Sequence, residues 1–123
     1  MPLFESAENY LERILMLELK QGSVRAVDLA NDMNFTKPSV SVALKNLRES
    51  GYVEVGEGGS LLLTERGREE AERVYERHTV IERLLRALGV SEAEAFADAC
   101  KIEHDISETT FECLKKHLER LEA

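Results

Sequence analysis

Apolar residues recur every three or four positions along most of the chain, which is the spacing of one face of an α-helix. Serine or threonine precedes several of these stretches, and their hydroxyl groups can accept bonds from the exposed N–H groups of a first helical turn. Glycines follow several others and stop them. The pattern predicts helices over residues 7–19, 26–33, 37–50, 65–88, 92–104 and 108–121.

A different pattern interrupts the helices in the middle of the chain. Residues 52–55 alternate at period two, residues 56–60 are rich in glycine, and residues 61–63 are three leucines, which together favour a β-hairpin. A helix, a short helix, a three-residue break, a further helix and a hairpin form the order of a winged helix-turn-helix. We therefore predict a mainly α fold, with a winged helix-turn-helix domain at residues 1–63 and a helical domain at residues 64–123.

Net charge at first argues against a nucleic-acid partner. The 123 residues hold 16 Lys and Arg against 24 Asp and Glu, a formal charge of -8, whereas phosphate binders usually carry a basic excess. The segment 33–48, however, contains Lys37, Lys45 and Arg48 and no acidic residue. This local positive charge lies on the helix that would approach DNA.

The second helix of the predicted helix-turn-helix begins with short polar side chains, which can bond to base edges in the major groove. Pro38 and Val42 could contact thymine methyl groups, whereas the hairpin tip has no basic residue and is expected to contact DNA weakly. Such patterns also arise by chance in helical proteins, and a small cationic cluster is often only a solvated face. The candidate DNA-binding residues are Thr36, Lys37, Pro38, Ser39, Ser41, Val42 and Lys45.

Potential metal ligands recur at helical spacing on three predicted helices. Residues spaced i, i+3 and i+4 share one helix face and can reach a single ion. Mixed nitrogen, oxygen and sulfur donors favour Fe(II), Zn(II), Co(II) or Mn(II) over Ca(II) or Mg(II). The candidates are Cys100 with Glu103 and His104, His78 with Glu82, and Asn9 with Glu12.

Each group has a simpler interpretation. His78 and Glu82 could form a surface pair on one helix, and Cys100 could be a small buried apolar residue. Cys113 and His117 are also four residues apart, but no third donor lies close to them in sequence, so we interpret them as a structural cysteine and a surface histidine.

The chain resembles the diphtheria-toxin-repressor and manganese-transport-regulator (DtxR/MntR) family of metal-dependent repressors over nearly its full length. The resemblance rests on residues 8–12, 36–41, 62–67, 77–85 and 100–107, and the last stretch, Cys-Lys-Ile-Glu-His-Asp-Ile-Ser, is the most specific. It implies a cytoplasmic homodimer whose second domain serves metal binding and dimerisation, and which binds double-stranded operator DNA when loaded with Fe(II) or Mn(II). Zn(II), Co(II) or Ni(II) could replace these ions in vitro.

The resemblance also assigns ligands by position. Glu103, His104 and His78 match ligands shared across the family, whereas Cys100 matches a position that holds cysteine in iron-type members and glutamate in manganese-type members. Glu82 matches a second-site ligand of iron-type members, and Glu12 matches a ligand of manganese-type members. Asn9 stands where the family usually has methionine or aspartate, and Phe96 stands where iron-type members have histidine.

Other classes of protein fit the sequence less well. The chain has no run of about 18 apolar residues, no basic and apolar leader, and only two cysteines, which suits the cytoplasm and argues against a membrane protein. It lacks a His-Glu-x-x-His helix, a nucleophile elbow and a phosphate loop, so we expect no enzymatic activity. The alternative is a metal-independent winged-helix regulator that senses redox state or a small ligand.

Overall fold

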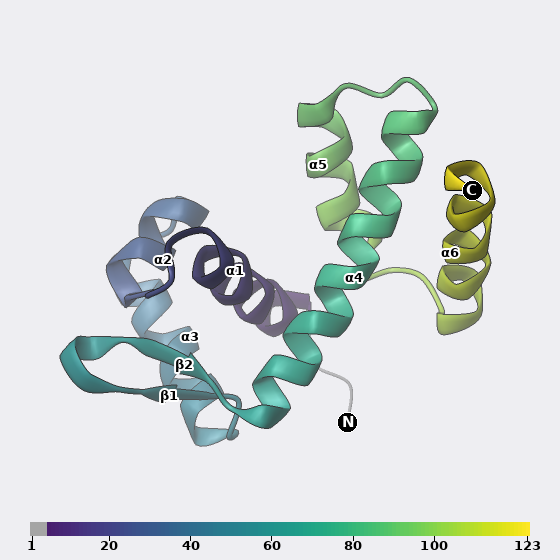
Figure 1. Ribbon diagram of the computed structural model, residues 1–123. Helices are drawn as coiled ribbons and strands as arrows, with labels where there is room; N and C mark the ends of the chain where they lie inside the picture. The colour runs from purple at the N-terminus through teal and green to yellow at the C-terminus, as the bar shows by residue number, and fades with distance from the viewer. Residues whose placement is uncertain (1–4) are drawn as a thin grey trace. The chain divides into compact units, whose positions relative to one another are not determined.

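The computed structural model describes residues 5–123. Among these residues it contains six α-helices, one short 3-10 turn and one two-stranded antiparallel sheet (Figure 1). The elements are α1 (Glu5–Gln21), α2 (Ala26–Met33), α3 (Lys37–Glu49), β1 (Val53–Val55), η1 (Glu57–Gly59), β2 (Leu61–Leu63), α4 (Glu65–Ala87), α5 (Glu92–Ile102) and α6 (Glu108–Glu122). The predicted mainly α fold with a winged helix-turn-helix is confirmed.

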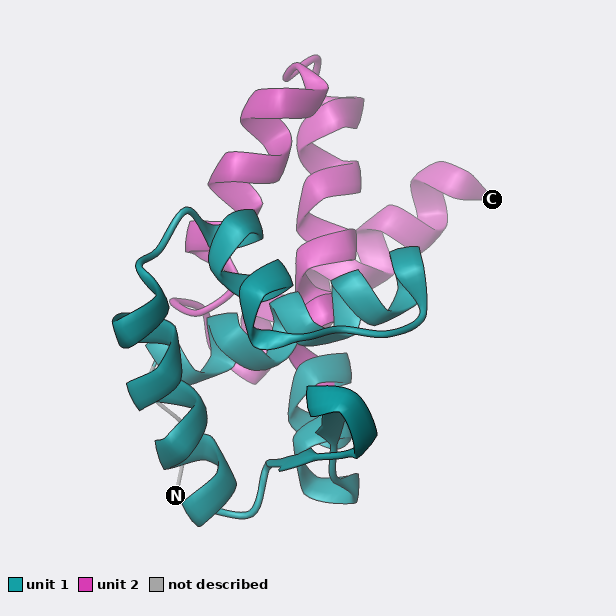
Figure 2. Cartoon of the chain, turned by 90° about the vertical axis from the view of Figure 1, so that its left-hand side faces the viewer, with its two compact units in different colours: residues 1–72 teal, residues 73–123 magenta. Residues whose placement is uncertain are grey.

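The chain forms two compact units, residues 1–72 and residues 73–123 (Figure 2). The division falls inside α4, which is one continuous helix. The predicted domain boundary, between residues 63 and 64, precedes this helix and stays a prediction. No described helix combines the length and the apolar character needed to cross a membrane.

In the first unit, α1 packs against α2, α3 and β2, while β1 packs against α3. Apolar side chains from each of these elements are almost completely buried and form the core, because helical spacing places them on one face of each helix. They include Leu11, Ile14, Leu29, Val40, Leu47, Val53 and Leu61. The hairpin pairs Val53 with Leu63 and Val55 with Leu61, and Arg25 adds a β-bridge to Ser60.

Helix α3 begins as the sequence predicts. Thr36 is the N-cap, and its hydroxyl accepts a 3.3 Å hydrogen bond from the backbone N–H of Ser39. Pro38 lies in the first turn, where its missing N–H costs no helical hydrogen bond. Asn34 ends α2 with a left-handed backbone, φ 56°. The turn between the two helices is therefore short and fixed by local hydrogen bonds.

The first turn of α4 is attached to the segment that follows α3. The Thr64 hydroxyl donates a 2.7 Å bond to the Gly51 carbonyl and accepts one from the Gly67 N–H at 3.1 Å. Arg66 donates to the Tyr52 hydroxyl at 2.9 Å and lies over the Tyr52 ring, 4.5 Å from its centroid. Gly67 approaches so closely that a Cβ atom there would overlap the Tyr52 carbonyl oxygen. We call the contacts of Thr64, Arg66 and Gly67 with residues 50–52 the α3–α4 clamp.

The second unit contains the rest of α4 together with α5 and α6, and α4 and α5 run side by side (Figure 1). Its small core joins Val80 of α4 to Phe111 and Leu118 of α6. Ser91 and Ser107 cap α5 and α6, each accepting a backbone N–H bond from the residue three positions later. Both caps follow from the sequence.

Helices α1 and α5 differ most from their predicted bounds. Helix α1 spans Glu5–Gln21, two residues longer at each end than the predicted 7–19, so Ser6, the residue before the predicted start, lies inside the helix. Helix α5 ends at Ile102, two residues before the predicted end at His104. The Asp105 N–H bonds to the Ile102 carbonyl at 3.0 Å, which is a tighter turn than the α-helix makes. Glu103 and His104 are therefore held by a turn.

Replacing Gly67 with alanine should destabilise the protein. The new methyl group meets backbone at Tyr52, which cannot rotate away, and overpacking of this kind costs about 3 kcal/mol at the upper end. Urea unfolding of wild type and Gly67→Ala measures the loss. Gly58→Ala is the control, because its left-handed φ of 68° costs about 1 kcal/mol but its surroundings are open. Equal losses in the two variants would show that the close approach has no energetic importance.

Candidate metal centre and nucleic-acid interface

Three potential metal ligands from two helices and a turn converge in the second unit. One donor atom from each of His78, Cys100 and Glu103 lies within 4.8 Å of the others. His78 Nδ1 is 3.1 Å from Glu103 Oε2 and 3.8 Å from Cys100 Sγ. His78 and Glu103 are buried and Cys100 is partly buried. We call these three residues the His–Cys–Glu cluster.

The opposite nitrogen of the imidazole faces another acid. His78 Nε2 is buried, makes no hydrogen bond among the described residues, and lies 3.7 Å from Glu82 Oε1, one turn further along α4. The Phe96 ring packs edge-on against the imidazole, with 4.7 Å between ring centroids. Glu82 is therefore close enough to share an ion with His78, whereas Phe96 contributes shape and no donor.

His104 occupies a different position from the one that helical spacing suggests. Helix α5 ends at Ile102, so Glu103 and His104 lie in the turn that follows it, and His104 is not among the three residues whose donor atoms converge. His104 Nε2 instead lies 3.3 Å from Glu103 Oε1, the carboxylate oxygen on the other side from His78. Its side chain is only 2% exposed. Glu103 thus stands between two imidazoles.

Electrostatics hold a proton on His78 in the absence of an ion. Burial alone lowers the pKa of His78, but hydrogen bonds and charge interactions with Cys100 and Glu103 outweigh it and raise the pKa to about 10. The protonated ring can then donate from Nδ1 to Glu103 Oε2. A divalent cation offers these donors the same compensation as the proton, with two positive charges in place of one.

The chemistry of the cluster fits a transition-metal ion. Thiolate, imidazole and carboxylate together suit Fe(II), Mn(II), Co(II) and Zn(II) better than Ca(II) or Mg(II). The buried Nε2 atom of His78, directed toward Glu82, is a nitrogen donor that the described residues leave without a hydrogen bond. Four residues of one compact unit can therefore supply nitrogen, sulfur and oxygen ligands.

The remaining two metal candidates belong to the first unit. Glu12 and Asn9 lie on α1, where Glu12 is 1% exposed and Asn9 is partly buried. Burial of a carboxylate is unusual unless a partner compensates its charge, which marks Glu12 as more than a surface acid. The expected ligand roles of Glu12 and Asn9 stay predictions.

The predicted DNA-contacting residues share the outer face of α3 and its N-terminal end. All seven are exposed, including Val42 at 61%, while Val40, Leu44 and Leu47 on the opposite face enter the core. The N-terminal turn thus presents its hydroxyl groups and Lys37 to solvent. The exposed residues are Thr36, Lys37, Pro38, Ser39, Ser41, Val42 and Lys45.

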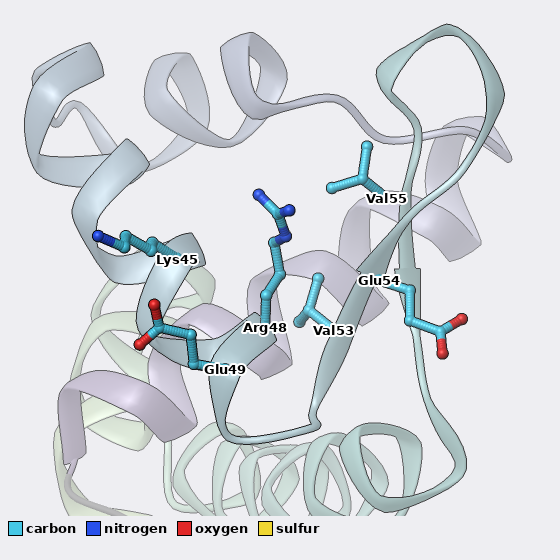
Figure 3. Close-up of a pocket in the computed structure, with 6 residues that line it drawn as sticks. All are labelled: Lys45, Arg48, Glu49, Val53, Glu54 and Val55. Atoms are coloured by element: carbon cyan, nitrogen blue, oxygen red, sulfur yellow. The ribbon is translucent and has the colours of Figure 1, made fainter.

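A hollow of about 690 Å³ separates α3 from the hairpin (Figure 3). Lys45 and Arg48 line it from α3, and Val53 and Val55 line it from β1. Figure 3 shows the Arg48 side chain rising between the helix and the strand, whereas Glu54 points away from α3. Glu49 also lines the hollow from α3, so its helical side carries two cations and one carboxylate.

The structure adds one cation that sequence reasoning missed. Arg25 pairs with Ser60 as a β-bridge, and its Nη2 atom lies 3.4 Å from where a Cβ atom on Gly59 would stand. A guanidinium group thus lies against a hairpin turn that has no basic residue of its own. No local signal could reveal this, because the bridge joins residues 35 positions apart.

Family comparisons match both halves of the chain. Residues 2–60 match the N-terminal DNA binding domain of the iron dependent repressors, and residues 64–123 match the metal binding and dimerisation domain of the same family. An HTH-type transcriptional regulator of Methanocaldococcus jannaschii is 35% identical over 118 residues, which cover 94% of each chain. The transcriptional regulator MntR of Escherichia coli is 34% identical over 111 residues, which cover 90% of this chain and 72% of the relative.

Solved structures agree with these matches. The structure of a manganese-dependent transcriptional repressor in complex with manganese superposes with a TM-score of 0.82 at 27% identity. The match covers 92% of this chain and 52% of the other. This chain therefore spans about half the length of that solved relative.

Protonation of His78 predicts a pH dependence for the metal-free protein. The folded-state pKa is raised from 6.5 to about 10, so the stabilisation is fully present below pH 6.5 and is lost as the pH rises toward 10. Urea unfolding with a chelator should show wild type more stable than His78→Gln at pH 7, with the difference shrinking by pH 9.5. Parallel stability profiles for the two proteins would contradict the raised pKa.

Proposed function

Since the chain belongs to the iron-dependent repressor family, we propose that it is a divalent-metal-dependent transcriptional repressor that binds operator DNA as a homodimer. The metal would be Fe(II) or Mn(II), the regulated genes those of metal homeostasis, and the location the cytoplasm. The buried His–Cys–Glu cluster is the observation that carries this proposal. The family consists of transcriptional repressors, so the protein is not an enzyme.

His78, Cys100 and Glu103 would hold the ion, because their donor atoms already lie within 4.8 Å of one another. Glu82 would add a carboxylate on the Nε2 side of the imidazole. His104 would either ligate directly or orient Glu103, whose Oε1 atom it contacts. Family resemblance adds Glu12 and Asn9 from α1 as further ligands. The bound ion would supply positive charge that offsets several buried acids.

The donor atoms of the cluster differ in the metal ion that they prefer. The Cys100 thiolate favours Fe(II), Zn(II) and Co(II), whereas the carboxylates also suit Mn(II). The manganese complex of the solved relative supports Mn(II) as a ligand of this fold. We propose Fe(II) or Mn(II) as the physiological ion, and Zn(II), Co(II) or Ni(II) as ions that bind in vitro.

Metal would act on DNA binding by linkage. Without an ion, the buried acids repel one another, and the arrangement competent for DNA is only one of several. An ion that binds this arrangement best shifts the population toward it, and operator DNA must then strengthen metal binding by the same factor. The +2 charge also reduces the repulsion between the acidic protein and phosphate.

In DNA recognition, α3 would enter the major groove by its N-terminal end, and a homodimer would present two such helices to a palindromic operator. Thr36, Ser39 and Ser41 would bond to base edges or phosphates, while Pro38 and Val42 would contact thymine methyl groups. Lys37 and Lys45 would contact phosphates. Arg25 would supply the hairpin with the cation that its tip lacks.

One contact favours a redox-sensing alternative. Cys100 Sγ lies 3.8 Å from the His78 imidazole, and a partly exposed cysteine beside an imidazole is a typical environment for a redox-sensing thiol. A metal-independent winged-helix regulator could use this pair to sense oxidants. Cys100→Ser distinguishes the two proposals, because unchanged metal affinity in calorimetry would favour the redox sensor.

We expect DNA binding to depend on metal by about 100-fold, within the usual range of allosteric coupling. Operator duplexes are selected from a random pool with the Mn(II)-loaded protein, and their affinity is measured by fluorescence anisotropy with Mn(II) and with chelator. His78→Gln should bind weakly in both conditions. Lys45→Gln should keep the metal dependence of DNA binding. It should reduce the slope of log affinity against log salt concentration by about 1, because one phosphate contact is lost. Equal wild-type affinity with metal and with chelator, or no enrichment of any duplex, would contradict the proposal.

Replacing Cys100 with glutamate should shift metal preference from Fe(II), Co(II) and Zn(II) toward Mn(II). A carboxylate is a harder ligand than a thiolate, so the softer ions lose most. Anaerobic DNA-binding titrations with each ion measure the order of preference, with Cys113→Ser as the control because Cys113 is exposed on α6. An unchanged order would remove Cys100 as the determinant of metal choice.

A further inference from the structure

Arg77 is a buried arginine that directly precedes His78 in α4, and its side chain is directed to the turn that carries Glu103. Its Nη1 atom donates to the Ile106 carbonyl at 2.8 Å and to the Glu103 carbonyl at 3.3 Å. Its side chain is only 7% exposed. The guanidinium therefore bonds both ends of the turn between α5 and α6.

The other side of the guanidinium is attached to α6. Nη2 donates to the Glu108 carboxylate at 2.9 Å, and the group lies 5.3 Å from the centroid of the Phe111 ring. Glu108 is in the first turn of α6, and Phe111 belongs to the core of the second unit. The guanidinium thus has a fixed position, set by groups that are not candidate ligands.

From this geometry we infer that Arg77 is a positioning residue for metal binding, which sets the direction of the Glu103 carboxylate. Helix α5 ends at Ile102, and although the Glu103 N–H still bonds to the Ala99 carbonyl at 3.0 Å, the helical ladder does not continue through the carbonyls of Glu103 and Ile106. Arg77 compensates by bonding the backbone at both of these residues. The inference rests on the proposed metal function and assigns to Arg77 a role that neither spacing nor donor chemistry indicates.

The shape of the guanidinium group explains why an arginine is suited to this role. A guanidinium is planar and presents several N–H donors in fixed directions, so it can serve two carbonyls and a carboxylate at once. A lysine ammonium is a compact charge that cannot reproduce this fork. The outer partners of ligating side chains typically change metal affinity 10- to 100-fold when they are mutated.

The experiment compares wild type with Arg77→Lys in the full chain. Mn(II) affinity is measured by calorimetry, and the visible spectrum is recorded at saturating Co(II). We expect Mn(II) affinity to fall about 10-fold to 100-fold, together with a changed Co(II) spectrum, because a displaced carboxylate alters the ligand field. Arg83→Lys is the matched control, since Arg83 lies on the same helix with a side chain 58% exposed, and it should stay within about twofold of wild type.

A purely structural role gives a different result. Arg77→Lys would then unfold at lower urea without metal, while Mn(II) affinity and the Co(II) spectrum of the folded protein stay those of wild type, and this outcome overturns the inference. If Arg77→Lys fails to fold, Glu108→Gln replaces it, because this variant keeps both carbonyl bonds and loosens only the far side of the guanidinium. A weaker Mn(II) affinity with a changed Co(II) spectrum supports the inference, and wild-type values for both overturn it. Wild type that binds neither ion contradicts the metal function itself, independently of any variant.

Discussion

The contact between His78 and Glu103 imposes the strongest physical constraint on the second unit. Both side chains are almost completely removed from water, with 3.1 Å between Nδ1 and Oε2. A buried charge is costly unless a partner compensates it, so this pair persists only with a shared proton or a cation. Cys100 on α5 and the turn after α5 gather around the pair. The packing of this region therefore requires a proton or a cation between His78 and Glu103.

The distribution of charged residues explains how an acidic protein can belong to a family of DNA-binding regulators. Of the acids in the chain, Glu12 and Glu103 are each only 1% exposed and so contribute to the interior more than to the surface field. The cations Lys37, Lys45 and Arg48 are concentrated on α3, and Arg25 stands at the hairpin. Net charge thus describes the surface that DNA would meet less well than the local distribution does.

Local sequence signals predict much of the fold and part of the site. Helical periodicity and caps at Thr36, Ser91 and Ser107 place most helix starts, because a cap acts within four residues. Spacing also brings His78 to Glu82. It fails at the end of α5, where the tertiary contact of Arg77 with the Glu103 and Ile106 carbonyls competes with continuation of the helix. Arg25 was missed for a similar reason, since contacts between distant residues leave no periodic trace.

The α3–α4 clamp fixes the orientation of α3 relative to the first turn of α4. Because Gly67 allows backbone to touch backbone at Tyr52, and Thr64 bonds the Gly51 carbonyl, the start of α4 and the end of α3 have little freedom to slide or rotate separately. The first turn of α4 is thus joined to the helix that would meet DNA. A rotation of this turn would carry α3 with it and change the angle at which α3 is presented.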